Sequence, residues 1–190
     1  MSSSVQGDSS SVSIDLVRAD ERGLLANLLE LYLHDMSEIY AQVELGADGR
    51  FGYPRLDSYW TERALRFPFL IRSEGKVKGF ALAQRGSPAS DDPEVFDVAE
   101  FFVLRSQRRS GVGELAARLL WERLPGSWIV RVAERNRGGL PFWTRVIESY
   151  AGNAVSQRLR GDEPNRVRIF AFDTQSVIDS GGREPGYAPR

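Results

Sequence analysis

One stretch of the chain, residues 98–115, joins the pattern of a buried strand directly to that of an amphipathic helix. Its first part, VAEFFV, is apolar, β-branched and aromatic, which is typical of a buried strand. Its last part repeats apolar residues at helical spacing, namely Val112, Leu115, Ala116, Leu119 and Leu120. The stretch therefore predicts a strand, a tight turn and the N-terminus of a helix.

The turn between these two elements has the residues of an anion-binding site. Arg108 and Arg109 precede Gly111 and Gly113. The glycines let a ligand approach the main chain without a Cβ in the way, and the first N–H groups of a helix have no acceptor within it. The helix dipole and the two guanidinium groups also favour negative charge at this point. We predict that the turn binds a phosphate group.

Composition removes several other classes of protein. The 190 residues suffice for one domain with a full core, and the net charge of −1 gives no general attraction to nucleic acid or to a membrane. Cysteine is absent, which excludes disulfides, thiolate metal sites and a cysteine nucleophile. A single histidine argues against a histidine metal centre. We therefore expect no metal, no nucleic acid and no membrane as a partner.

The two ends of the chain differ in composition from the part between them. Residues 1–10 are serine-rich and predict a disordered tail, residues 174–190 predict a loose tail with glycine and proline, and residues 11–173 predict one folded domain. No series typical of a secretion signal opens the chain, and no apolar run approaches the roughly 20 residues that cross a bilayer. We expect a cytoplasmic protein.

Hydrophobic periodicity and turn residues predict the element order β-α-α-β-β-β-α-β-α-β-β between the tails. The predicted strands are 11–18, 68–72, 77–84, 95–104, 128–133, 155–159 and 167–172, and the predicted helices are 20–35, 56–66, 112–124 and 141–150. The fourth strand and the third helix flank the predicted phosphate site.

The turn and the element order together resemble one family. The motif Arg108-x-x-Gly111-x-Gly113 between a strand and a helix resembles the acyl-CoA signature of the GNAT family, the GCN5-related N-acetyltransferases. The element order over residues 12–172 is that of the GNAT fold. The resemblance implies an α+β architecture, the GNAT or acyl-CoA N-acyltransferase fold, with a mixed central sheet and helices on both faces.

The resemblance implies acetyl-CoA as co-substrate and an amine, on a small molecule or a protein, as acceptor, and it admits a homodimer. In the family, the amides of the signature hold the pyrophosphate of the coenzyme, and an N–H of the fourth strand faces the thioester oxygen. Residues 136–143 resemble a second motif, Asn-x-x-Ala-x-x-Phe/Leu-Tyr, that flanks the pantetheine arm. The implied coenzyme-binding positions are Val103, Leu104, Arg108, Arg109, Ser110, Gly111, Val112, Gly113, Asn136 and Phe142. The implied reaction is acetyl transfer to a primary amine by direct attack in a ternary complex.

The glycine turn also fits another pattern. Residues 111–116 match the dinucleotide-binding fingerprint G-x-G-x-x-A, and Glu134 follows about 20 residues later, where an acid that binds ribose belongs. A dinucleotide-binding unit normally begins near its fingerprint, whereas a long segment of other pattern precedes it here. The paired arginines also suit coenzyme A better. A dinucleotide-binding protein is the less favoured alternative.

Two carboxylates on the fourth strand are candidates for the catalytic base. A carboxylate on this strand, acting directly or through water, is the commonest solution in the family that the chain resembles. Asp97 and Glu100 would lie on opposite faces of a regular strand, so at most one of them should face the substrate. Glu100 has apolar neighbours that would raise its pKa into a useful range, and we favour it over Asp97. The alternative for each is a charge at a strand end or a structural hydrogen bond.

The proton donors of the family are replaced in this chain. The usual tyrosine corresponds to Trp143, whose indole cannot protonate a thiolate. The glutamate found on the fifth strand in the branch that acetylates ribosomal-protein N-termini corresponds to Arg131. Tyr150 is an alternative donor, although we expect it in the core. These departures raise a second hypothesis, a non-catalytic module of the same fold that binds acyl-CoA.

Acidic and aromatic side chains that could recognise a cationic amine gather in and after the first helix. They are Tyr32, His34, Asp35, Glu38, Tyr40, Tyr53, Tyr59 and Trp60. We favour the simpler interpretation that they form a solvated helix face together with some core aromatics. Strong apolar periodicity places Trp121, Trp128 and Phe142 in the core.

Overall fold

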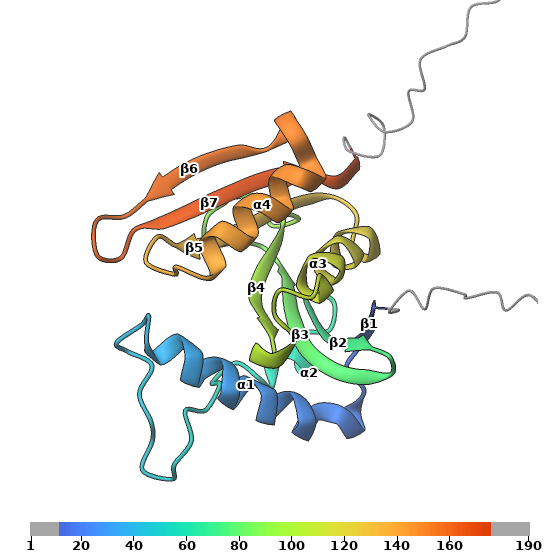
Figure 1. The fold of residues 1–190 in the computed structure, drawn as a ribbon, viewed down its shortest axis with the longest axis vertical. Coiled ribbons are helices and arrows are strands. Elements are labelled where there is room, and N and C mark those ends of the chain that lie inside the picture. The colour runs from blue at the N-terminus through green and yellow to red at the C-terminus, as the bar shows by residue number, and fades with distance from the viewer. Residues whose placement is uncertain (1–11, 176–190) are drawn as a thin grey trace, which may run out of the picture.

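The computed structural model describes residues 12–175, which form a seven-stranded sheet in the order β1-β2-β3-β4-β5-β7-β6 (Figure 1). Its strands are β1 (Val12–Leu16), β2 (Arg66–Ser73), β3 (Lys76–Arg85), β4 (Phe96–Val103), β5 (Ser127–Ala133), β6 (Ser156–Arg160) and β7 (Val167–Asp173). Neighbouring strands are antiparallel except β4 and β5, which are parallel. The predicted mixed sheet is confirmed.

Helices cover both faces of this sheet (Figure 1). They are α1 (Arg22–Ser37), α2 (Ser58–Thr61), α3 (Val112–Arg123) and α4 (Gly139–Ala151). The side chains of β3 alternate between two cores: Phe80 packs with Leu29 of α1, whereas Ala81 packs with Leu120 of α3. Because successive strand residues point to opposite faces, one core lies under α1 and α2 and the other under α3 and α4.

The predicted helix at 56–66 is wrong over most of its length. Only Ser58–Thr61 is helical, and β2 already begins at Arg66. Arg66 and Phe67 pair with Gln84 and Ala83 of β3, so the sheet recruits residues that the local pattern assigned to a helix. Tertiary pairing overrides a short helical preference here.

The described part of the chain ends in a fixed segment. Thr174 is buried, and it exchanges hydrogen bonds with Gly126 through both its main chain and its hydroxyl group. The predicted tail at 1–10 and most of the tail predicted at 174–190 lie outside the described residues. None of the helices within residues 12–175 has the length and apolar character needed to cross a membrane.

A β-bulge in β4 decides where its carboxylates point. Leu82 of β3 pairs with Glu100, while the next residue, Ala83, pairs with Val98, so that one extra residue is inserted in β4. Gln84 pairs with Asp97, and Leu82 and Gln84 are two residues apart on one face of β3. Asp97 and Glu100 therefore lie on the same face of the sheet. The prediction of opposite faces assumed a regular strand and is wrong.

β4 and β5 are paired over only part of their length. Their last paired residues are Val98 and Val130, although β4 continues to Val103 and β5 to Ala133. Beyond this point the two strands part, and main-chain groups on that side of β4 lose their sheet partners. The parting begins at the bulge, so both irregularities occur in the middle of β4.

Candidate functional site

The predicted phosphate turn connects β4 to α3 and has an unusual backbone. Arg109 and Gly111 both have positive φ values, 63° and 84°. The main-chain N–H of Leu115 donates to the carbonyl of Gly111. The N–H groups of Val112, Gly113 and Glu114 precede this bond and so have no acceptor within the helix. The turn therefore presents main-chain donors at the positive end of the α3 dipole.

Gly113 is placed where a side chain would meet the other predicted coenzyme contacts. A Cβ at this position would lie 3.3 Å from a ring carbon of Phe142 and 3.5 Å from a methyl carbon of Val103. The structure thus brings together three positions from β4, α3 and α4 that the sequence predicted for coenzyme binding. Ser110, also predicted, is exposed, and its hydroxyl donates to the carbonyl of Gln107.

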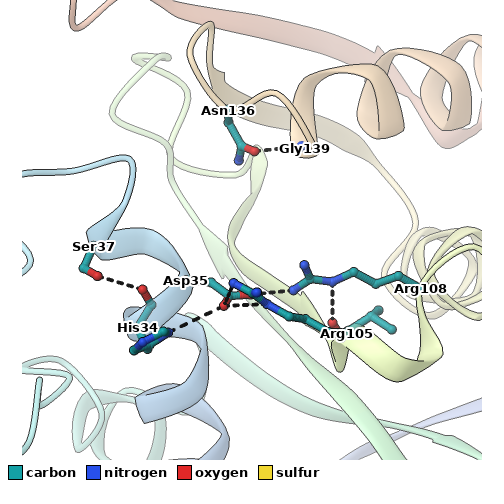
Figure 2. Close-up of polar contacts among 8 residues, drawn as sticks. His34, Asp35, Ser37, Arg105, Arg108, Asn136 and Gly139 are labelled. Atoms are coloured by element: carbon teal, nitrogen blue, oxygen red, sulfur yellow. Dashed lines mark hydrogen bonds and ion pairs between the residues drawn. The ribbon is translucent and has the colours of Figure 1, made fainter.

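The guanidinium group of Arg108 lies away from these amides. It donates to the carbonyl of Val103 at 3.0 Å and to Asp35 at the end of α1 at 2.6 Å (Figure 2). Arg105 donates to the other oxygen of Asp35 at 2.6 Å. Burial acts to raise the pKa of Asp35, but the hydrogen bonds from Arg105 and Arg108 outweigh it and hold that pKa below its usual value. Arg108 thus ties the phosphate turn to α1.

The pairing of β4 with β3 shows which of the two predicted main-chain donors, Val103 or Leu104, is free of the sheet. The N–H of Leu104 donates to the carbonyl of Lys78. In an antiparallel pair, successive residues point their polar groups alternately toward and away from the partner strand. Val103 therefore points its N–H and C=O away from β3, toward the side where β5 has parted, and its carbonyl accepts the hydrogen bond from Arg108. Of the two donors, Val103 faces the open side.

Asn136 has a clear structural role at the start of α4. Its side-chain oxygen accepts the N–H of Gly139 at 2.7 Å, and its carbonyl accepts the N–H of Leu140 (Figure 2). A Cβ at Gly139 would lie 2.5 Å from the side-chain nitrogen of Asn136, so this position has no room for a larger residue. Asn136 fixes the first turn of the helix that carries Phe142.

Glu100 is the centre of a hydrogen-bonded cluster under α1. The hydroxyl of Tyr32 in α1 donates to one of its oxygens, and the hydroxyl of Tyr53 donates to the other at 3.1 Å. Burial raises the pKa of Glu100, whereas the two hydroxyls and Arg131 lower it. Burial and the charge of Glu100 raise the pKa of Tyr32 and of Tyr53, so both hydroxyls stay protonated and donate.

Asp97 occupies a different environment, although it lies on the same strand and face. It is fully buried, and Arg131 of β5 binds it with two hydrogen bonds of 2.8 and 2.7 Å. The hydroxyl of Ser87 also donates to it. Both oxygens of Asp97 are thus taken up by Arg131 and Ser87, and its side chain is closed off from a substrate. The geometry therefore favours Glu100 over Asp97 as a base.

Trp143 of α4 lies in the core, as do the tryptophans predicted there, while Phe142 and Tyr150 are partly buried against it. Trp143 is buried, with its ring 5.0 Å from that of Phe101. Tyr150, near the other end of α4, packs on Trp121 with ring centroids 4.7 Å apart. Neither residue lies beside Glu100, and the expected core positions of Trp121 and Trp128 are confirmed.

The residues suggested for the acceptor divide into two groups. Tyr32, Tyr53 and the buried Tyr59 belong to the core under α1 and face Glu100. His34 and Glu38 are exposed, which is the solvated helix face that the simpler interpretation predicted. Sequence reasoning missed the hydrogen bonds to Glu100, because Tyr32 belongs to a helix pattern and Tyr53 to a loop, and neither pattern indicates a common partner.

A hollow of about 420 Å³ lies next to this cluster. Its lining includes Glu30 and Tyr53, and Glu30 accepts the N–H groups of Phe51 and Gly52 at 2.7 and 3.1 Å. Tyr53 thus contributes to the hollow and to the binding of Glu100. The segment between α1 and α2 is held in place over this part of the sheet.

No protein-family model and no curated protein sequence matches the chain. Solved structures do match, however. The aminoglycoside acetyltransferase AAC(6')-Ib with coenzyme A has a TM-score of 0.65 at 13% identity, over 90% of this chain and 100% of that one. YncA of Salmonella typhimurium with acetyl-CoA has a TM-score of 0.57 at 13% identity, over 95% and 99% of the two chains.

A GNAT-family acetyltransferase from Staphylococcus aureus also matches, with a TM-score of 0.55 at 9% identity over 86% of this chain and 99% of that chain. These likenesses show that the chain has the GNAT fold, as the signature and the element order predicted. The fold also removes the basis of the dinucleotide alternative, since β4 and β5 are the single parallel pair in the described sheet.

Proposed function

We propose that this chain is a cytoplasmic N-acetyltransferase that moves the acetyl group of acetyl-CoA to a primary amine by direct attack in a ternary complex. The observation that carries the proposal is the position of Glu100. This carboxylate is held by two tyrosines on the part of β4 between its last pair with β5 and the phosphate turn. A base on β4 and a turn after β4 that can bind the phosphates of the coenzyme suit acetyl transfer from acetyl-CoA to an amine.

The residues that would hold the coenzyme fit its chemistry. The N–H groups at the start of α3 would bind the pyrophosphate, and Gly111 and Gly113 leave the main chain accessible. Val103 would offer its N–H to the thioester oxygen, and Phe142 lies beside Gly113 along the expected course of the pantetheine arm. Structures of similar fold that contain coenzyme A or acetyl-CoA support this assignment.

Glu100 would remove the proton that the amine must lose. The nitrogen lone pair attacks the thioester carbonyl carbon, the C–S bond breaks, and the electron pair leaves with sulfur as the thiolate. The surplus proton of the nitrogen passes to Glu100, directly or through water. The hydroxyls of Tyr32 and Tyr53 keep the carboxylate oriented. Kanamycin bound with coenzyme A in the aminoglycoside enzyme of the same fold supports an amine acceptor.

The leaving group needs no protein acid in this proposal. Trp143, at the position of the usual tyrosine, is packed in the core and has no acidic proton to give. A thiol with a pKa of about 8.5 leaves as the thiolate without prior protonation. Tyr150 packs on Trp121 at the far end of the helix and takes no part.

The test measures binding and turnover separately. A melting experiment with acetyl-CoA, with NAD as control, reports binding, because a ligand at 100 times its Kd adds about 2.7 kcal/mol to the free energy of unfolding. Release of free thiol over a panel of primary amines reports transfer. Stabilisation by acetyl-CoA with amine-dependent thiol release supports the enzyme. Stabilisation without turnover of any amine would support the acyl-CoA-binding module instead, and a shift with NAD alone would overturn both.

A further inference from the structure

Arg131 lies where the bulge of β4 and the separation of β4 from β5 meet. It follows Val130, the last residue of β5 that pairs with β4, and is therefore level with the bulge of β4. Because of that bulge, Asp97 and Glu100 lie on one face of the sheet, with Asp97 before the bulge and Glu100 after it. Arg131 lies just beyond the last pair of β4 and β5, and it binds Asp97, which lies within the paired part, with two hydrogen bonds.

The charges around Glu100 are unequal. Hydroxyl groups surround it from α1, α2 and the segments next to them, one carboxylate lies on its own strand, and one cation comes from β5. These groups are Tyr32, Tyr40, Tyr53, Tyr59, Asp97 and Arg131. Arg131 is thus the cation that favours the ionised form of Glu100, against burial and against the negative charge of Asp97.

We propose that Arg131 is a positioning residue for the reaction: held rigidly by Asp97, its guanidinium group keeps the Glu100 carboxylate ionised and ready to accept the proton of the amine. Asp97 acts in turn through Arg131, since its two hydrogen bonds fix the guanidinium group at this height of the sheet. This role rests on the proposed function of Glu100. Both members of a partly buried ion pair beside the reacting centre would then act in the reaction.

A purely structural role makes a different prediction. If the pair merely joined β4 to β5 at the parting, removal of either partner would break the same connection. The two kinds of variant would then lose stability together, and the pKa of Glu100 would stay where it is. Under the proposal the two partners act on Glu100 with opposite sign, because one is a cation and the other an anion.

Three variants of the full chain separate these cases. Asp97→Asn keeps an acceptor for Arg131 and Ser87 but removes the negative charge, so the pKa of Glu100 should fall. Asp97→Asn combined with Arg131→Gln leaves a neutral pair that can still form hydrogen bonds, and the pKa should rise on the order of one unit above that of Asp97→Asn. Arg131→Lys keeps the cation and should hold the pKa near the wild-type value.

The readout is the pH titration of the Glu100 carboxyl carbon by ¹³C NMR, with the signal assigned by its loss in Glu100→Gln. The acidic limb of the kcat/KM profile for a productive amine should move with the NMR value. A fall of the Glu100 pKa in Asp97→Asn relative to wild type, followed by a rise from Asp97→Asn to the double variant, supports the proposal. An equal Glu100 pKa in folded Asp97→Asn and in the folded double variant overturns it, as does an Arg131→Lys variant whose Glu100 pKa departs from the wild-type value. The NMR titration needs no substrate, so it tests the role of Arg131 even in a protein that turns over no amine. Turnover of an amine tests the proposed function separately.

Discussion

The two halves of the site are built in different ways. The phosphate turn is one continuous segment, and its donors are main-chain N–H groups whose positions follow from Gly111 and the start of α3. The Glu100 cluster instead takes side chains from β4, from α1 and from the segment before α2, and its charge depends on β5. The turn is therefore determined locally, whereas the cluster exists only in the assembled fold. Variants of each half should fail in different ways.

The largest expected effect comes from Glu100→Gln. Removing a general base lowers the rate by about 10²- to 10⁴-fold, so kcat of a productive amine should fall in this range while acetyl-CoA affinity stays the same. Steady-state kinetics and calorimetric titration measure the two quantities. Glu38→Gln, on the exposed end of α1, is the matched control and should leave both unchanged. Equal loss of kcat and of coenzyme affinity would mean that the two halves are not independent.

The same variant has an expected pH-dependent stability. Burial raises the pKa of Glu100 above its value in the unfolded chain. The free energy of unfolding therefore falls as the pH rises through the raised pKa. Glutamine at this position does not ionise. The melting temperature of Glu100→Gln relative to wild type should therefore be higher at pH 8 than at pH 5. An unchanged difference across this range would contradict a raised pKa.

The second largest effect is expected at the phosphate turn. Gly111→Ala places a Cβ on a residue with φ of 84°, which costs about 1 kcal/mol and shifts the N–H groups that follow. We expect acetyl-CoA affinity to fall about tenfold or more, with kcat at saturation changed little. Gly152→Ala at the end of α4, with φ of 54°, is the matched control for backbone strain. It should destabilise the protein at least as much, because its ψ of −130° suits glycine alone, without weakening acetyl-CoA binding.

This contrast also explains what could be predicted from the sequence. The strand, turn and helix at residues 98–115 follow from local periodicity and from the glycines of the turn, and the fold was predicted by the resemblance of the turn and the element order to one family. The position of the bulge in β4 could not be predicted from the sequence, because it depends on how β3 pairs with the strand. The partners of Glu100 were also out of reach, since Tyr32 and Tyr53 are 68 and 47 residues away from it in the chain.

The side chain of Arg108 depends on a part of the fold that is distant in the sequence. Its sequence position predicted a guanidinium group beside the phosphate, but the fold brings Asp35 of α1 within 2.6 Å of that group. A partner from a distant helix thus binds a side chain of the signature itself, and the contact of Arg108 with a phosphate stays a prediction. The main-chain half of the prediction depends on no such partner, because the N–H groups are fixed by the helix that they begin.

A smaller effect is expected from Tyr53→Phe. This variant removes one hydrogen bond to the ionised Glu100, so the pKa of Glu100 should rise, and the variant should lose more activity at low pH than at high pH. We expect a loss of up to about tenfold at the acidic end of the profile, shrinking as the pH rises. The kcat/KM profile measures both. A loss independent of pH would assign Tyr53 to acceptor binding rather than to the control of Glu100.

The smallest effect is expected from Asp35→Asn, which connects the two halves. Asp35 lies in α1, beside the Glu100 cluster, yet its carboxylate binds Arg105 and Arg108 at the phosphate turn (Figure 2). The neutral side chain should release part of this positive charge to the coenzyme phosphates and tighten acetyl-CoA binding about two- to fivefold, since exposed charge pairs contribute up to about 1 kcal/mol. The gain should shrink in high salt, because screening weakens exposed charges. Calorimetric titration at two salt concentrations measures this. Weaker binding in the variant would instead show that Asp35 holds the arginines in the position that the coenzyme needs, and that the phosphate turn is less local than its sequence suggests.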